Sequence, residues 1–362
     1  MATRQLYHEA ANTERTGAAH RRGTINVMEA PNLLPTQFAP GFKPEDLVFE
    51  EQADYEKGFA AYFDANLRPI LIAENENRLA CLRESKKRAW IGIPLIVILI
   101  AAGFVLDGMS HSKKPAGLRV AVFAAAAIVA WMSAPKIMYR RQSKNAILPV
   151  VANFYGFLKY SEVEPAPEEF LTRSRLVPPG DPGLRYWGDH VHGDYHGILL
   201  ESWQLTTARR EKKSRVVLYS GLFIHFGLKK RLEKYTLVKF RHNLFNRPLF
   251  DFSFQGLEHV ALEDPEFEKM FDAYSTDQIE SRYLLTPDVM QHLKELSGVF
   301  GGSPVDCCFT GQDAFLSIEL KKRLFEPPPP NQSPISSKDI HVFLNQMNHL
   351  FGIIDLLNID HR

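Results

Sequence analysis

The chain has 362 residues, with 43 Lys and Arg against 42 Asp and Glu, a formal net charge of +1 and 45% hydrophobic residues. A near-neutral chain gives no case for a nucleic-acid-binding protein, because such proteins usually carry a strongly basic domain or stripe. Three cysteines, two of them adjacent, offer neither a disulfide framework nor a two-pair zinc motif and suit a reducing compartment. No cofactor is expected from these features.

The first part of the chain predicts a tail followed by a helix. Residues 1–43 mix Thr, Ala, Asn, Gly and Pro with few periodic apolar positions, which predicts a mobile tail. Apolar residues recur at three- and four-residue steps over residues 44–88, so we expect an amphipathic helical stalk there. Pro69 is expected to kink or break that stalk.

Residues 89–109 and 118–138 are two strongly apolar stretches. The first has no charge between Ala89 and Leu106 and is long enough to cross a bilayer, which takes about 20 residues. The connection between the stretches, SHSKKPAG, is so short that the two must form an antiparallel hairpin over residues 89–138. For the alanine-rich second stretch, a buried core helix is the alternative.

The charges around the hairpin predict its direction. Three basic residues lie at the connecting loop, whereas seven lie just outside the pair: Arg83, Lys86, Lys87, Arg88, Arg140, Arg141 and Lys144. Because basic residues are enriched in cytoplasmic flanks, both termini are predicted to lie in the cytoplasm. Membrane lipids are therefore expected partners through two spans.

The rest of the sequence, from residue 139 onward, predicts an α+β domain of antiparallel strands with helices near its end. Residues 139–162 are predicted to form a second stalk helix that leaves the membrane, and residues 183–326 a cytoplasmic domain rich in strand-forming residues. Residues 327–336 are predicted to be a proline-rich linker, and residues 337–362 an amphipathic C-terminal helix.

Within the domain, residues 258–298 predict one strand and then two helices. Asp264 followed by Pro265, and Thr286 followed by Pro287, are typical of helix starts.

The segment GDHVHGDYHG is the most suggestive candidate for chemistry. His190, His192, Asp194 and His196 alternate, as ligands on one face of a strand would, and imidazole with carboxylate is a good ligand set for zinc. Tyr195 adds one residue relative to the H-x-H-x-D-H pattern of metallo-β-lactamase-like hydrolases, and the glycines suggest turns. A metal site at these histidines is one hypothesis, and a solvated strand-and-turn segment is the other.

The cysteines and the basic runs also allow both a functional and a structural interpretation. Cys307 and Cys308 have no assignable catalytic partner, so buried packing is expected. Basic runs at hairpin turns or strand ends would either face anionic lipid or form an ordinary solvated face. Their residues are Arg209, Arg210, Lys212, Lys213, Lys229, Lys230 and Arg231.

Three motifs resemble a bacterial family of uncharacterised membrane proteins, DUF3137. They are GDYHGILLESWQL, VLYSGLFIHFGL and LEDPEFEKMFDAYSTDQIESRYLLTPDVMQHL, and the resemblance extends over about residues 49–326. It implies a multi-pass protein of the bacterial inner membrane but no activity and no catalytic residue. The strand order is also similar to a pleckstrin-homology-type meander, which would not fix a function.

The sequence therefore predicts a membrane-anchored binding or scaffold module without catalysis, with a protein partner of unknown identity. Asp277, Glu280 and Arg282 are its candidate partner contacts, or else a capping and ion-pair cluster that holds helices together. The alternative function is a membrane-tethered metal-dependent hydrolase that uses His190, His192 and His196.

Overall fold

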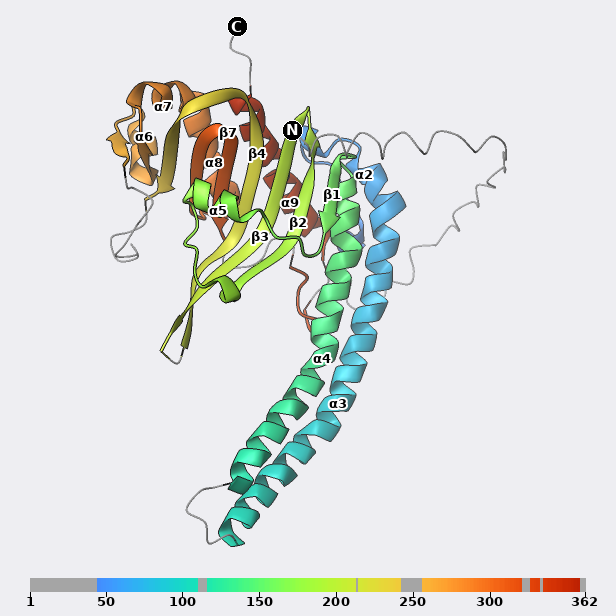
Figure 1. Ribbon diagram of the computed structural model, residues 1–362. Coiled ribbons are helices and arrows are strands. Elements are labelled where there is room, and N and C mark those ends of the chain that lie inside the picture. Colours follow the sequence, from blue (N-terminus) through green and yellow to red (C-terminus); the bar gives the residue numbers. More distant parts are fainter. Residues whose placement is uncertain are drawn as a thin grey trace, which may run out of the picture. The chain divides into compact units, whose positions relative to one another are not determined.

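The computed structural model describes residues 44–109, 116–212, 214–241, 256–320, 326–332 and 335–358 (Figure 1). The chain divides into two units, Met1–Gln37 and Phe38–Arg362, and every described residue belongs to the second. The predicted mobile tail, residues 1–43, lies outside the described residues, as does Lys213.

The N-terminal helical part ends in a long hairpin. Its elements are η1 (Pro44–Leu47), η2 (Asp54–Glu56), α2 (Phe59–Tyr62), the π-helical turn η3 (Phe63–Leu67), α3 (Arg68–Met109) and α4 (Ala116–Asn153). Pro69 is the second residue of α3 and directly follows the π-helical turn, so the helical hydrogen-bond pattern changes where a proline has no N–H to donate. The break expected at Pro69 thus coincides with the junction of η3 and α3.

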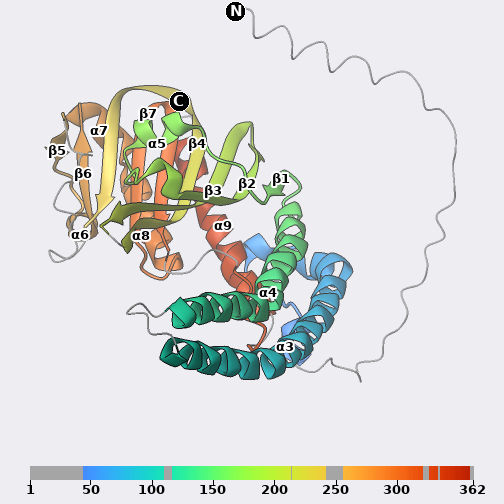
Figure 2. The same ribbon diagram turned by 60° about the horizontal axis from the view of Figure 1, so that its bottom comes forward.

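Helices α3 and α4 lie side by side and antiparallel (Figures 1 and 2). Each is long and apolar enough to cross a membrane, by length and composition. Their large apolar side chains point outward: Trp90 is 85% exposed, Phe104 61% and Phe123 78%. A core helix would bury such side chains, so these two helices lack the packing of a core.

The two helices approach closely where small residues face each other. A Cβ added at Gly103 would lie 2.9 Å from the Cβ of Ala121 and 3.1 Å from the carbonyl oxygen of Gly117. At the turn, the Asp107 carboxylate accepts hydrogen bonds from the backbone N–H groups of Gly117 (2.7 Å) and Leu118 (2.8 Å). This carboxylate caps the start of α4, where the helix dipole favours negative charge.

The predicted second stalk helix is shorter than expected, because α4 ends at Asn153 and not at residue 162. Gly156 has a φ of 74°, which the helix cannot contain, and the chain then forms β1 (Leu158–Ser161). Strand β1 pairs with β2, so this segment is a strand although its apolar residues have helical spacing.

The described strands form one antiparallel sheet in the order β1-β2-β3-β4-β6-β5, with β7 also paired to β4. Their bounds are β2 (Arg185–Tyr195), β3 (Ile198–Glu211), β4 (Ser214–Phe240), β5 (Glu258–Val260), β6 (Phe271–Ser275) and β7 (Val305–Glu319). The mixed α+β class with antiparallel strands is thus confirmed, whereas the likeness to a pleckstrin-homology meander remains a prediction.

Two strands differ from the sequence-based prediction. Strand β4 runs unbroken through the basic run at Lys229, Lys230 and Arg231, where a turn or strand end was expected; its pairing with β7 shifts there instead. The segment predicted as two helices contains a strand, β6, between α6 (Pro265–Met270) and α7 (Gln278–Leu284). Helix α8 (Pro287–Val299) follows, with Thr286 as its N-cap.

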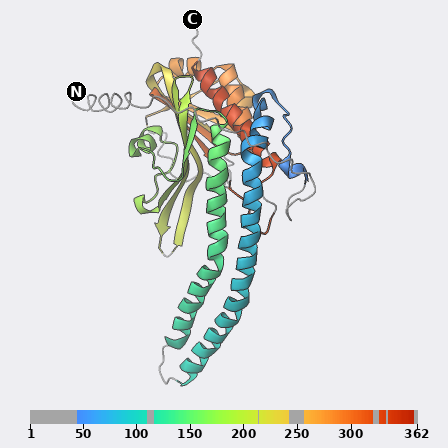
Figure 3. The ribbon, with the colours of Figure 1, turned by 90° about the vertical axis from the view of Figure 1, so that its right-hand side faces the viewer.

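Helices lie on both faces of the sheet (Figure 3), and each face carries a cluster of buried apolar side chains. The larger contains apolar residues of α8 and α9 (Ser337–Leu357). The smaller lies on the face that carries α5 (Glu168–Ser174) and includes Trp203, Phe223 and Phe315, with Phe170 of α5 packed against it. The candidate site lies on this second face.

The proline-rich segment before α9 is not a free spacer. The Arg78 guanidinium of α3 donates to the carbonyl oxygens of Pro330 and Gln332, each at 3.1 Å. Arg140 of α4 donates to the carbonyl oxygen of Pro327 at 3.4 Å. This segment therefore lies against both long helices.

Candidate functional site

A row of titratable side chains crosses the sheet on the α5 face. His192 of β2 lies opposite Glu201 of β3, and Glu201 lies opposite His225 of β4. Residues paired directly across antiparallel strands project from the same face, so the three side chains are neighbours. Sequence spacing alone does not give this row, because it depends on the register of three strands.

His190 joins the row from the same strand as His192. The pairing of β2 with β3 shifts between Gly188 and Val191, and Asp189 within this bulge has a φ of 45°. The His190 ring lies 4.9 Å from the ring of Trp203, nearly parallel, and 4.6 Å from the ring of His192. Only 3% of His190 is exposed, so its ring is held by packing on both sides.

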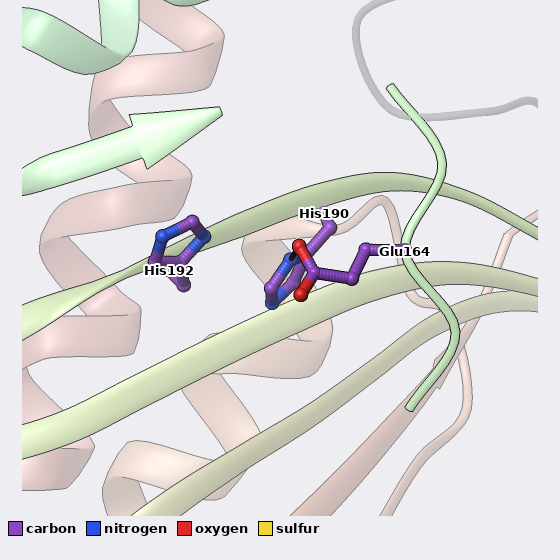
Figure 4. Close-up of side chains that lie close together, drawn as sticks. All are labelled: Glu164, His190 and His192. Atoms are coloured by element: carbon purple, nitrogen blue, oxygen red, sulfur yellow. Dashed lines mark hydrogen bonds and ion pairs between the residues drawn. The ribbon is translucent and has the colours of Figure 1, made fainter. Parts of the chain in front are cut away.

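Carboxylates contact His190 at both of its ring nitrogens. Nδ1 lies 3.0 Å from Oε2 of Glu164, which stands in the segment after β1 (Figure 4). Nε2 lies 3.6 Å from Oε1 of Glu201. Ser161 of β1 donates to Glu164 at 3.1 Å.

The chain of contacts continues to α5. The other Glu201 oxygen lies 3.4 Å from Nδ1 of His225, and Nε2 of His225 lies 2.8 Å from Oδ1 of Asp313 in β7. Asp313 also pairs with Arg173 of α5. Acidic and basic groups therefore alternate from the segment after β1 to α5.

These contacts shift the pKa values of the groups in the row. The neighbouring His190 and then His225 lower the pKa of Glu201 to about 2. Burial alone would lower the pKa of His190, but Glu201 and Glu164 outweigh burial and raise it. Burial and then the neighbouring His190 lower the pKa of His192, and the hydrogen bond with His190 is the main cause that lowers the pKa of Glu164.

Glu201→Gln is expected to make the melting temperature less sensitive to acid. With a folded pKa of about 2 against an ordinary 4.5, the Glu201 carboxylate contributes its full stability above pH 4.5. That contribution is lost as the pH falls through about 2, and the variant lacks it at every pH. Thermal unfolding of both proteins between about pH 6 and pH 3 measures this difference.

The matched control is Glu211→Gln, at the exposed end of the same strand, where 48% of the carboxylate side chain is exposed. If the two variants show the same pH profile, the Glu201 contacts do not stabilise the fold. The raised pKa of His190 acts with the opposite sign, since its contribution is present below pH 6.5 and is lost as the pH rises through the folded value.

The structure does not bring the three predicted histidines together. His196 lies beyond the end of β2, with a φ of 52°, in the turn before Gly197. Its ring stacks on Tyr195, and its Nδ1 is 3.9 Å from Oδ1 of Asp355. The turn removes His196 from the face of the strand that carries His190 and His192.

Glu164 takes the place that the sequence hypothesis gave to His196. One ligand atom from each of Glu164, His190 and His192 lies within 4.8 Å of the others. Glu164 is 26 residues from His190 in sequence. Only the pairing of β1 with β2 brings the two together, so no sequence spacing could have found this group.

Of the three predicted partner contacts, two make hydrogen bonds within the fold and the third is exposed. Asp277 is the N-cap of α7 and accepts from the N–H groups of Ile279 (2.8 Å) and Glu280 (3.0 Å). The Glu280 carboxylate accepts from the N–H groups of Glu233 and Lys234 in β4. Arg282 is exposed. The capping interpretation therefore accounts for Asp277 and Glu280, but not for Arg282.

The described residues of the predicted basic runs are exposed and form two separate groups. Arg209, Arg210 and Lys212 lie at the β3–β4 hairpin, and the second group, Lys229, Lys230 and Arg231, lies within β4. Up to about 50 Å of strand separates Ser214 from Lys229, at about 3.3 Å per residue. This separation does not favour contact of both groups with one flat lipid surface.

Cys307 and Cys308 are fully buried, as expected from sequence. Burial raises the pKa of both thiols, that of Cys308 to about 12. A thiol in this state is a poor nucleophile at neutral pH.

Comparison with known proteins supports the family resemblance. The model of a family described as "Protein of unknown function (DUF3137)" matches residues 217–359. This confirms the resemblance for the chain from β4 onward. The match includes α9, which the sequence motifs left outside, and it does not include the two long helices or β1 to β3.

No curated protein matches the chain. A solved structure, the crystal structure of the mycobacterial trehalose monomycolate transport factor A, TtfA, aligns with 55% of this chain and 91% of its own, at 9% identity and a TM-score of 0.31. A likeness at this level carries no argument about fold or function.

Proposed function

We propose that this chain, whose residues 217–359 match DUF3137, is a membrane-anchored module that binds another protein and performs no catalysis itself. The junction between α4 and the sheet carries the proposal. Lys144 Nζ lies 2.6 Å from Oδ1 of Asp189, with side chains only 15% and 8% exposed. Arg141 pairs with Glu162, and Asn145 donates to the same carboxylate at 3.0 Å. Helix α4 thus runs without a break from the second apolar stretch to the residues that contact the sheet domain.

The exposed apolar side chains of α3 and α4 support placement in a bilayer, since contact with water would leave them unpacked. The positive-inside rule favours both termini and the sheet in the cytoplasm. The bacterial inner membrane follows from the resemblance to DUF3137. In this placement a basic group near anionic lipid contributes about 1 kcal/mol per residue. Either the hairpin group at Arg209 or the β4 group at Lys229 fits that role.

Helix α7 offers the surface for a protein partner. Ile279 is 70% exposed and Tyr283 is 78% exposed, one turn apart and next to the exposed Arg282. Tyr and Arg are enriched among residues that dominate binding energy at protein interfaces. Asp277 and Glu280 position this helix, and the contacts with a partner come from Ile279, Arg282 and Tyr283.

The test is photocrosslinking of the full chain in intact cells, with p-benzoylphenylalanine in place of Tyr283. We expect one defined protein to be captured from position 283, and Ile279→Asp to abolish the capture. The matched control places the same probe at Tyr186 of β2, a second exposed tyrosine. Capture of lipid or of a second copy alone, or of the same proteins from both positions, would count against a partner at α7.

A metal-dependent hydrolase that uses His190, His192 and His196 is not favoured, because His196 stands apart from the other two. Such an enzyme would need three ligands on one ion.

A further inference from the structure

We propose that Glu164, His190 and His192 form a binding site for a divalent transition-metal ion, with Glu201 as the carboxylate that orients His190. The site uses none of the contacts assigned to the protein partner and stands independently of that function. It also differs from the three-histidine hypothesis, because a carboxylate from the segment after β1 replaces His196.

The contact between His190 and Glu164 already has nearly the required length. Zinc binds imidazole nitrogen and carboxylate oxygen at about 2.1 Å, so two tetrahedral ligand atoms lie about 3.4 Å apart. Nδ1 of His190 and Oε2 of Glu164 are 3.0 Å apart. An ion therefore fits between them if it takes the place of the shared proton and the two atoms separate by a few tenths of an ångström.

His192 supplies the third ligand atom. Its ring lies 4.6 Å from that of His190, and all three ligand atoms lie within 4.8 Å of one another (Figure 4). The Nδ1 atom of His192 is buried and has no hydrogen-bond partner among the described residues. The side chain is only partly buried, so a change of rotamer can bring this nitrogen closer.

A carboxylate and an aromatic ring lie next to His190 on the sides away from Glu164. A histidine that binds metal through one nitrogen usually donates the other N–H to a carboxylate, which fixes the tautomer and the ring. Here Nε2 of His190 faces Oε1 of Glu201 at 3.6 Å. Glu201 is held in turn by His225, and His225 by Asp313. The stack on Trp203 fixes the plane of the His190 ring.

The ligand set selects the class of ion. Two imidazoles and one carboxylate suit Zn²⁺, Co²⁺ or Ni²⁺, whereas Mg²⁺ and Ca²⁺ prefer oxygen ligands. Glu164 is open to water, with 58% of its side chain exposed, so an ion can enter from this side.

Metal would also tie the segment after β1 to β2, beside the junction with α4. Glu162 contacts Arg141, and Asp189 contacts Lys144, and these acidic residues lie two positions and one position from Glu164 and His190. An ion on Glu164 and His190 thus joins the two strand segments that hold α4.

The test uses the full chain in detergent, stripped with a chelator and titrated with Zn²⁺ in competition with a chromogenic indicator. We expect one ion per chain, at least tenfold weaker binding in His192→Ala and in Glu164→Gln, and unchanged binding in the matched control His196→Ala. Glu164 is exposed, so its variant keeps the test valid if His192→Ala unfolds. Substituted Co²⁺ should show the spectrum of nitrogen and oxygen ligands without thiolate.

The absence of stoichiometric Zn²⁺ binding by the wild-type chain would overturn the proposal. So would an equal loss in His196→Ala and His192→Ala, which indicates either binding at scattered histidines or the original three-histidine set. Binding that survives both His192→Ala and Glu164→Gln would place the ion elsewhere. Glu201→Gln should weaken binding while leaving one ion per chain, since it acts through the orientation of His190.

Discussion

Lys144→Ala is expected to lower the free energy of unfolding by about 3 kcal/mol, because it leaves the Asp189 carboxylate buried without its cation. Asp189 is 7% exposed, and its Oδ2 atom has no hydrogen-bond partner among the described residues. Tyr160 donates to Oδ1 at 2.9 Å, which compensates for the lost charge only in part. Thermal unfolding of the full chain in detergent, followed by circular dichroism, measures the loss.

Arg141→Ala is the matched control on the same helix. Arg141 also pairs with the sheet domain, through Glu162, but 68% of its side chain is exposed. Exposed ion pairs contribute about 0 to 1 kcal/mol, so this variant should remain close to the wild type. The double variant Lys144→Ala with Asp189→Asn should recover much of the stability, because the unpaired charge is gone and Asn tolerates the left-handed backbone at position 189.

Equal melting temperatures for Lys144→Ala and Arg141→Ala would contradict the role of this pair. The α4 junction would then depend on apolar packing, in which Val151 and Ala152 are fully buried. The main argument that polar contacts fix the sheet to the membrane helix α4 would then be wrong.

The sequence predicts helices well where the apolar spacing is long or where an N-cap residue marks the start of the helix. Asp264 and Thr286 are the N-caps of α6 and α8, and the amphipathic pattern after Ser336 corresponds to α9. Each of these signals depends on neighbours within about four residues, which the sequence contains directly.

Features that depend on distant pairing were missed. The segment around Tyr160 has a helical apolar pattern, but β2 pairs with it and makes it a strand. The basic residues at 229–231 suggested a turn, whereas pairing with β7 on both sides of the run keeps β4 continuous.

The candidate site depends even more on pairing between distant strands. His190 and His192 stood out because they alternate along one strand. Glu164 and Glu201 did not, since they meet the histidines only through the β1–β2 and β2–β3 registers. His196 appeared in the predicted set because alternation along the sequence continues into the turn, although the strand does not.

Gly221→Ala is expected to destabilise the fold by about 3 kcal/mol, as overpacking in a tight core does. A Cβ at this position would lie 2.0 Å from the carbonyl oxygen of Ile318 and 2.8 Å from the hydroxyl oxygen of Tyr219. Both neighbours are constrained: Ile318 belongs to the β7 backbone, and the Tyr219 hydroxyl donates to the carbonyl oxygen of Leu222 at 2.6 Å. The substitution must therefore push β7 away from β4.

Gly227→Ala, in the same strand, is the control. The nearest atom to its added Cβ is Cγ2 of Ile198 at 3.8 Å, an ordinary contact. Alanine also loses less conformational entropy on folding than glycine, so the change should lie within about 0.5 kcal/mol of the wild type or stabilise slightly. Thermal unfolding of the two variants side by side makes the comparison, and equal effects would show that β4 and β7 can separate at Gly221 without cost.

Gly221→Ala should also disturb the face of the sheet that carries Glu201, His225 and Asp313. Tyr219 and Phe223 flank Gly221 on the face that carries the Glu201 row, and Phe223 packs on Phe315 of β7 with ring centroids 6.0 Å apart. If β7 moves, Asp313 moves with it, and the 2.8 Å contact from His225 lengthens. Gly221→Ala should then weaken Zn²⁺ binding through the chain from Asp313 to His190, whereas Gly227→Ala should leave it unchanged.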